Sequence, residues 1–258
     1  MRRTTLFFLI IASLFLSCRS VNFKGSGTSA PNHDNWTQLL KKHVAENGAV
    51  NYPGFIKDSS ALNTYLELLS NTPPDDDKWS REEQIAYWIN VYNAFTVKLI
   101  IDHYPVESIK DIGSKINIPF VTTPWDIKFF KIGEQQMDLN LVEHGQLRKK
   151  LEEPRIHFAI VCASVSCPKL RREAFEAKSL EQQLDNSARE FLSDTLRNQV
   201  SVEQPRISKI FKWFTGDFTE EMTLIEYLNQ YAPVKITENT EIEYMEYNWA
   251  LNEKENFK

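Results

Sequence analysis

The fold is decided by one stretch, "SREEQIAYWINVYNAFTVKLIIDHYP", which runs from Ser80 to Pro105. Ser80 and Glu83 have the spacing of a capping box, and Pro105 cannot continue a helix, so the stretch predicts one long helix. Its apolar positions cover more than one face: Ile85, Trp88, Ile89, Tyr92, Phe95, Leu99 and Ile100. A helix that is apolar on several sides runs through a core rather than over it. We therefore expect the domain to be built around this helix.

Two asparagines interrupt the apolar surface of the predicted helix. Asn90 and Asn93 are three residues apart and therefore share a face. A buried amide costs free energy unless it is hydrogen-bonded. The favoured interpretation is that both amides bind the backbone of a packed loop; the alternative is that they form the polar floor of a substrate site.

A second stretch, "FFKIGEQQMDLNLVEHGQLRKKLEEP" (129–154), predicts a hairpin followed by a helix. Gly133 fits a turn between two short strands. Asn140 and Glu143 again have capping-box spacing, here for a helix from Leu141 to about Leu151. Short strands of this kind indicate a small sheet beside the long helix.

The inward face of this second helix carries charged and titratable groups. Leu141, His144, Arg148 and Leu151 follow helical spacing and share one face. An inward histidine alone is more often a satisfied core residue. An arginine one turn later favours a carboxylate partner, for which Asp217 is a better candidate than Glu143, or an anionic ligand.

The stretch "RIHFAIVCASVSCP" (155–168) predicts a buried strand followed by a reactive loop. Its near-continuous apolar run is typical of a central strand buried on both faces, and alternation along it turns His157 away from Cys162. Pro168 fits the first position of a following helix, which makes Cys167 the cap residue. The helix dipole would lower the pKa of a thiol there, so Cys167 is the better nucleophile candidate.

The redox state of Cys162 and Cys167 stays open at this stage. An oxidising compartment favours a disulfide, a helix cap favours a free reactive thiol, and two inert buried thiols are the third possibility. Four residues between the cysteines permit a disulfide only if the loop folds back. The C-x4-C spacing is not that of a zinc site, and we expect neither a metal nor a cofactor.

The first eighteen residues, "MRRTTLFFLIIASLFLSC", predict where the protein is located. Two arginines precede an apolar run too short to span a bilayer comfortably, which indicates a signal peptide over 1–17. Its end resembles the lipobox of bacterial lipoproteins, which implies cleavage before Cys18 and acylation of that residue. An ordinary secretory leader is the alternative. We expect an envelope lipoprotein that faces the periplasm or the exterior, with membrane lipid as its partner.

Composition and charge limit the remaining possibilities. Residues 18–35 are polar and rich in Gly, Ser and Asn, which predicts a flexible tether after Cys18, and the globular domain then spans 36–258. At 258 residues and 42% hydrophobic content the chain can bury a substantial core. The net charge of −5 argues against nucleic acid as a partner.

Six stretches, in order, resemble the successive blocks of the domain of unknown function 547 family, which occurs in bacterial secreted proteins and in plants: "YWINVYNAFTVKLI", "LVEHGQLR", "PRIHFAIVCASVSCPKLR", "QLDNSAREFL", "SKIFKWFTGDF" and "YNWALN". The resemblance covers most of the chain from about residue 80. It implies a single α+β domain with a long buried helix and a small mixed sheet, similar to papain-like and transglutaminase-like folds. Those enzymes carry their nucleophile at the start of a core helix, where this chain offers Asn90. The family has no settled activity, and its blocks place emphasis on Asn90, Asn93, Glu143, His144, Arg148, His157, Cys162, Ser164, Cys167 and Asp217.

Two functions of different classes fit these residues. The first is a thiol-dependent hydrolase or acyl transferase acting on peptide or amide substrates. In it Cys167 or Cys162 attacks the substrate, and His144 or His157 takes the proton. Asp217 or an asparagine orients the histidine. The candidate substrate contacts are Asn90, Asn93, Glu143, Arg148 and Ser164.

The second function is a non-catalytic, lipid-anchored binding module for an acidic ligand or a protein partner. In this interpretation His144 and Arg148 hold the acidic group. Hydrogen-bond contact between a histidine and a cysteine sulfur would favour the enzyme.

Overall fold

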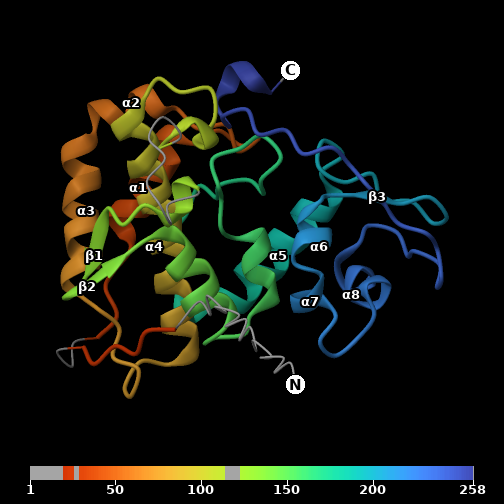
Figure 1. Ribbon diagram of the computed structural model, residues 1–258, viewed down its shortest axis with the longest axis horizontal. Coiled ribbons are helices and arrows are strands. Elements are labelled where there is room, and N and C mark those ends of the chain that lie inside the picture. The colour runs from red at the N-terminus through yellow and green to blue at the C-terminus, as the bar shows by residue number, and fades with distance from the viewer. Residues whose placement is uncertain (1–19, 26–28, 114–122, 258) are drawn as a thin grey trace, which may run out of the picture.

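The computed structural model describes residues 20–25, 29–113 and 123–257. The expected signal peptide and Cys18 lie outside these residues. Helices α1 (Asp34–His43), α2 (Tyr52–Lys57) and α3 (Ser59–Asn71) pack around α4 (Arg81–His103), as Figure 1 shows. One end of the domain is therefore a group of four helices with α4 at the centre of the group.

The long helix α4 forms as predicted. The Ser80 hydroxyl accepts a hydrogen bond from the Glu83 amide, and the Glu83 carboxylate accepts one from the Ser80 amide, which completes the capping box. Every residue of the segment 84–97 is buried. The helix thus runs through the core, and side chains on all of its faces meet other parts of the chain.

The strands are short and lie in two separate pairs. Strands β1 (Phe130–Ile132) and β2 (Gln135–Met137) are antiparallel, and Gly133 turns between them with a φ of +55°, as the hairpin prediction requires. Strands β3 (Arg206–Ile207) and β4 (Glu243–Tyr244) are parallel. The fold is α+β with very little sheet.

The central strand expected over 155–162 is absent, and this prediction was wrong. Residues Pro154–Phe158 form the short 3-10 helix η4, and no regular element follows before Cys162. The side chain of Asn93 donates to the Ala159 carbonyl and accepts from the Val161 amide. A side chain of α4 thus satisfies backbone groups that a strand would have paired with a neighbouring strand.

The second predicted helix exists, but its winding differs from the expectation. Element η3 (Leu141–Arg148) is a π-helix and is shorter than predicted. The capping box is not formed: the Asn140 side chain makes no capping hydrogen bond and donates to the Asp126 carboxylate instead, while Asp138 accepts from the Leu141 amide. The Glu143 side chain is buried instead.

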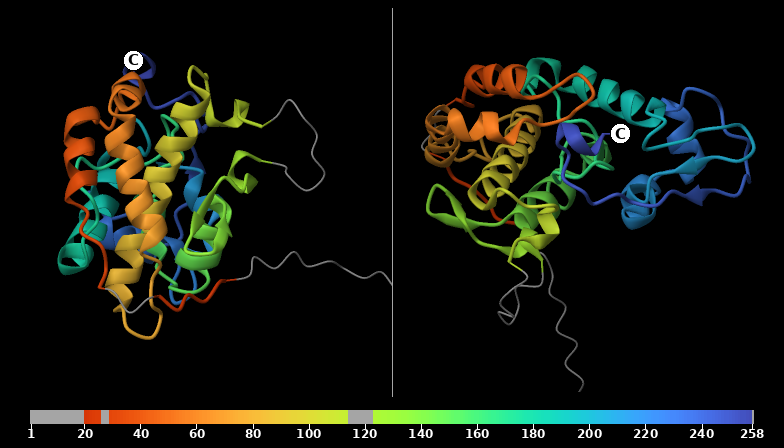
Figure 2. Two further views of the ribbon diagram at one scale, coloured as in Figure 1. Left: turned by 90° about the vertical axis from the view of Figure 1, so that its left-hand side faces the viewer. Right: turned by 90° about the horizontal axis from the view of Figure 1, so that it is seen from above.

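Four of the remaining helices contribute to a second hydrophobic cluster: α5 (Leu180–Ser193), α6 (Ile210–Trp213), α7 (Thr215–Phe218) and α8 (Leu224–Tyr231). Figure 2 shows α6 to α8 at the opposite end of the domain from α1 to α3. Helix α5 spans both parts, as the second view of Figure 2 shows. The other helical elements are η1 (Ile109–Asp111), η2 (Pro124–Asp126), η5 (Ala177–Ser179) and η6 (Lys254–Asn256). Between β4 and η6 the chain is irregular.

The segment predicted to be a flexible tether is partly packed. Phe23 is buried against Trp88, and its amide donates to the Asp76 carboxylate. The Val21 carbonyl accepts hydrogen bonds from Gln146 and Lys150. Residues 20–25 are therefore held against the domain, because Phe23 buries an aromatic ring in the core.

Candidate functional site

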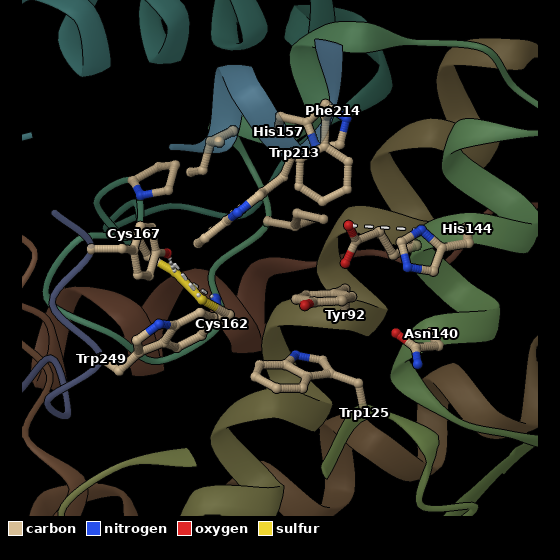
Figure 3. A pocket seen from close by; sticks show the side chains of 15 residues that line it. Tyr92, Trp125, Asn140, His144, His157, Cys162, Cys167, Trp213, Phe214 and Trp249 are labelled. Carbon is tan, nitrogen blue, oxygen red and sulfur yellow. Dashed lines mark hydrogen bonds and ion pairs between the residues drawn. A yellow bond between two sulfur atoms is a disulfide. The ribbon is translucent and has the colours of Figure 1, made fainter. Parts of the chain in front are cut away.

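A cavity of about 200 Å³ opens where α4, η3, the cysteine loop, α6 and the C-terminal segment meet (Figure 3). Its aromatic walls join the two hydrophobic clusters. The lining residues are Tyr92, Trp125, Asn140, Glu143, His144, His157, Ile160, Cys162, Cys167, Pro168, Ile210, Trp213, Phe214, Tyr247 and Trp249. An apolar cavity with a few convergent polar groups is typical of a ligand site.

Glu143 is the acidic group of this cavity. Burial raises the pKa of its carboxyl to about 7, although the charge of Arg148 and a hydrogen bond with Tyr92 act in the opposite direction. Tyr92 in turn is hydrogen-bonded to Trp125. Glu143 is therefore held in place and changes its protonation state near neutral pH.

His144 lies beside Glu143 and is uncharged near neutral pH. Burial and the nearby charge of Arg148 lower its pKa to about 4. Its Nδ1 lies 2.8 Å from Arg148 Nη1 and 3.9 Å from a Glu143 carboxyl oxygen. Because arginine can only donate, Nδ1 accepts this hydrogen bond and the ring proton resides on Nε2.

Asp217 joins Arg148 and His157 in a network at the cavity wall, to which His157 belongs. Arg148 Nε and Nη2 donate to the two Asp217 carboxylate oxygens at 2.5 and 2.7 Å, which confirms the predicted ion pair. His157 Nε2 lies 2.7 Å from Asp217 Oδ2, and the ring stacks on Phe214 at 4.0 Å. Although burial raises the pKa of Asp217, hydrogen bonds from Arg148 and His157 outweigh it and hold that pKa below its usual range. Burial lowers the pKa of His157.

The two cysteines are joined in a disulfide. A turn over Ser164–Cys167 folds the loop back and brings their Cα atoms to 6.3 Å. The helix predicted after Pro168 is absent, because no helix occurs over 168–176. The prediction that a helix dipole activates Cys167 was therefore wrong. The sulfurs contact the Cys162 amide, Ser164 and Tyr247. In Figure 3 they lie on a different wall from His144.

Three residues expected to contact substrate have structural roles. Asn90 binds both backbone groups of Phe175, and Asn93 binds Ala159 and Val161, so the interpretation of both amides as loop clamps is confirmed. Ser164 is fully buried beside the disulfide. None of the three lines the cavity.

The sequence analysis missed the aromatic part of the site. Trp213, Tyr247 and Trp249 contact one another in a cluster at the cavity, with ring centroids 4.6 to 5.8 Å apart. The two aromatic-rich stretches that carry them were the available signal. That signal is weak, because aromatic clusters of this kind are more often core than ligand contacts.

Two further findings concern metal binding and the membrane. No group of three or more histidines, cysteines or acidic residues in the described residues is arranged to hold a metal ion. The same residues contain no helix long and apolar enough to cross a bilayer.

Comparison with known proteins gives one match. Residues 77–192 match the family model described as "Protein of unknown function, DUF547", which supports the family resemblance found in the sequence. The matched segment includes α4, η3 and both cysteines, and it ends before Asp217 and the C-terminal aromatic wall. No curated protein and no solved structure matches the chain, so the likeness to papain-like folds stays a prediction.

Proposed function

We propose that the cavity is the active site of a hydrolase or acyl transferase for amide or peptide substrates, with Glu143 as the proton-transferring group. One observation carries this proposal: a buried carboxyl with its pKa raised to about 7 faces an aromatic cavity. A general acid or base works best when its pKa lies near the operating pH. Perturbed carboxyls in clefts are typical of active sites.

The roles of the residues follow from their protonation states. Ionised Glu143 takes a proton from the attacking water or acceptor, and the protonated form returns it to the leaving amine. Neutral His144 has its Nε2 proton available to donate to the oxygen that becomes negative. This mechanism replaces the cysteine nucleophile of the sequence analysis, because both sulfurs are engaged in the disulfide.

The shape of the cavity favours a small ring-bearing group. Its volume of about 200 Å³ suits one side chain or chain end rather than a long ligand. The aromatic walls suit an apolar or aromatic group. Arg148 already pairs with Asp217 through two nitrogens, which weighs against an acidic ligand.

The test is turnover by the full chain of aminoacyl 4-nitroanilides and 4-nitrophenyl esters with aromatic or aliphatic side chains. Glu143→Gln keeps the shape of the side chain but cannot accept the proton, so kcat should fall by at least about 100-fold with little change in KM. Glu134→Gln, at an exposed position of the β1–β2 turn, is the matched control and should keep full activity. Absence of turnover across the panel, or equal rates in Glu143→Gln and wild type, would contradict the proposal.

A second candidate is the non-catalytic binding module. Trp213 is 46% exposed although its ring contacts Tyr247 and Trp249 at the cavity, which is the arrangement of a ligand platform. If the chain only binds, Trp213→Ala should abolish binding of the same compounds in calorimetry. Glu143→Gln would then leave affinity unchanged, and no product would form.

A further inference from the structure

The Cys162–Cys167 disulfide lies in the wall of the cavity, and its two sulfurs are placed unequally. Both residues line the cavity, but Cys167 is only 2% exposed whereas Cys162 is half-buried. Figure 3 shows the Cys162 end of the bond on the side of Tyr92. A thiol that enters the cavity therefore reaches Cys162 before Cys167.

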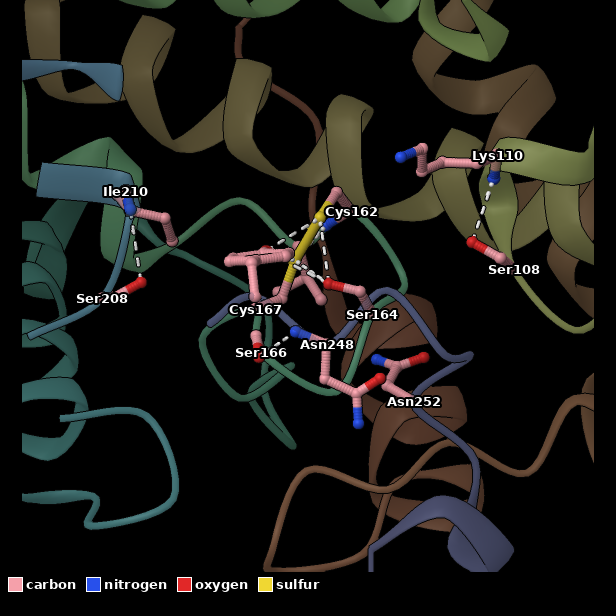
Figure 4. Close-up of a disulfide and its surroundings, with 12 residues drawn as sticks. Ser108, Lys110, Cys162, Ser164, Ser166, Cys167, Ser208, Ile210, Asn248 and Asn252 are labelled. Atoms are coloured by element: carbon pink, nitrogen blue, oxygen red, sulfur yellow. Dashed lines mark hydrogen bonds between the residues drawn. A yellow bond between two sulfur atoms is a disulfide. The ribbon is translucent and has the colours of Figure 1, made fainter. Parts of the chain in front are cut away.

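Hydrogen-bond donors surround the buried sulfur. The Cys162 amide donates to Cys167 Sγ at 3.0 Å (Figure 4 shows the loop). The Ser164 and Tyr247 hydroxyls lie 3.3 and 3.2 Å from Cys167 Sγ and 3.4 Å from Cys162 Sγ, so the amide is the contact that distinguishes the two sulfurs. Burial raises the pKa of Tyr247, so its hydroxyl keeps its proton and can donate. Hydrogen bonds to a charged group are about twice as strong as those to a neutral one. These donors therefore stabilise a Cys167 thiolate more than they stabilise the disulfide.

A buried cation lies on the same side of the disulfide. Arg197 is 4% exposed, pairs with Asp194 and donates from Nε to the carbonyl of Cys167. Its charge also acts on Tyr247. A fixed guanidinium beside the loop adds to the preference of Cys167 for the thiolate form.

We propose that the Cys162–Cys167 disulfide is a redox-active site that exchanges with a cysteine thiol, small or peptidic, entering the cavity. The incoming thiolate attacks Cys162 Sγ and forms a mixed disulfide with it. The Cys162–Cys167 bond breaks, and its electron pair leaves on Cys167 as a thiolate held by the Cys162 amide, Ser164 and Tyr247. A second thiolate then attacks the mixed disulfide, so that two substrate thiols are oxidised to a disulfide and the cysteine pair is reduced to two thiols. A small-molecule disulfide reverses these exchange steps, so that the Cys162–Cys167 disulfide forms again. This activity does not depend on Glu143.

The full chain is incubated in native buffer with excess reduced glutathione, quenched in acid, alkylated and digested with trypsin. Cleavage after Arg155 and Lys169 isolates both cysteines in one peptide, separate from Cys18. We expect the pair to open while circular dichroism stays native, and to re-form with oxidised glutathione. In Cys167→Ala, oxidised glutathione should add to Cys162. In Cys162→Ala, Cys167 should stay unmodified, because its sulfur is buried.

The rate of opening separates a redox site from a structural bridge. Tyr247→Phe and Ser164→Ala each remove a donor to the departing thiolate and should slow opening at least about fivefold. Tyr244→Phe, a tyrosine of β4 outside the donor set, is the matched control. Opening only in denaturant, or equal rates in Tyr247→Phe and Tyr244→Phe, would overturn the proposal. The two proposals can fail separately. Hydrolase activity measured in the Cys162→Ala/Cys167→Ala protein tests the Glu143 mechanism without the disulfide, so failure of the redox proposal is distinguished from failure of the hydrolase proposal.

Discussion

Glu143 and His144 are neighbours in the chain, and burial moves their pKa values in opposite directions. The pKa of Glu143 rises to about 7 and that of His144 falls to about 4, because a buried site disfavours the charged form of each. At neutral pH the histidine is therefore a neutral donor while the carboxyl is close to half-ionised. A proton donor and a group that exchanges its proton thus lie side by side on η3.

This pair predicts a pH-dependent effect of Glu143→Gln on the free energy of unfolding. The folded-state pKa of Glu143 lies above its ordinary value of 4.5, so its contribution to stability is fully present below pH 4.5 and is lost as the pH rises through 7. Glutamine does not ionise, so the variant does not lose stability in this way as the pH rises. The variant should gain about 3 kcal/mol relative to wild type between pH 4.5 and 8, and urea unfolding at pH 4.5 and pH 8 measures it.

His144 contributes a slope of the opposite sign in both proteins, because its lowered pKa means that stability is lost as the pH falls from 6.5 to 4. It therefore cancels from the difference between variant and wild type. Glu134→Gln is again the control and should show no change with pH. A pH-independent difference for Glu143→Gln would mean that Glu143 keeps its ordinary pKa in the folded protein.

At the scale of elements, features that depend on local sequence were predicted, whereas features that depend on long-range contacts were not. The first and last residues of α4 and the turn at Gly133 depend on only a few neighbouring residues each. These features were therefore predicted from sequence. The winding of η3 was not, because the same apolar spacing fits an α-helix and a π-helix. The segment after Arg155 was predicted as a strand because an apolar run alone does not distinguish a strand from an irregular buried segment. The clamp from Asn93 decides that outcome.

The Asn93 clamp predicts a large cost for Asn93→Ala. The substitution leaves the Ala159 carbonyl and the Val161 amide without this partner in a buried region, so the free energy of unfolding should fall by about 2 to 4 kcal/mol. Asn63→Ala on the exposed face of α3 is the matched control and should change stability by less than about 0.5 kcal/mol. Chemical denaturation of both variants measures the difference. Equal midpoints for the two variants would show that the segment before Cys162 is held by other contacts.

At the scale of the whole molecule, the site is assembled from segments that are distant in the chain. The Arg148–Asp217 pair spans 69 residues and was predicted from chemistry, because an inward arginine needs a carboxylate. The aromatic wall was not predicted, since burial and ligand contact require the same residue types. Which aromatic side chains remain exposed depends on how the C-terminal segment crosses between the two clusters, and no local pattern specifies that path.

The packed N-terminal segment changes the expected position of the domain relative to a membrane. We propose, as the lipobox resemblance implies, that Cys18 is the acylated first residue of the mature protein. Val21 is already held by Gln146 and Lys150, and Phe23 is in the core. Three residues span at most about 11 Å. An anchored domain would therefore lie close to the bilayer rather than at the end of a long tether.

Acylation of Cys18 predicts that the protein made in a bacterial host with lipoprotein processing partitions into the detergent phase of a Triton X-114 extraction. Cys18→Ala removes the acylated sulfur and should move the protein into the aqueous phase, since more than one acyl chain is needed for stable anchoring. Phe23→Ala is the companion variant: it loosens the packed segment but keeps the anchor, so it should remain in the detergent phase with lowered thermal stability. Wild-type protein found in the aqueous phase would show that the leader is an ordinary secretory signal. If wild type and Cys18→Ala were both found in the detergent phase, the domain would instead bind the membrane through its own surface.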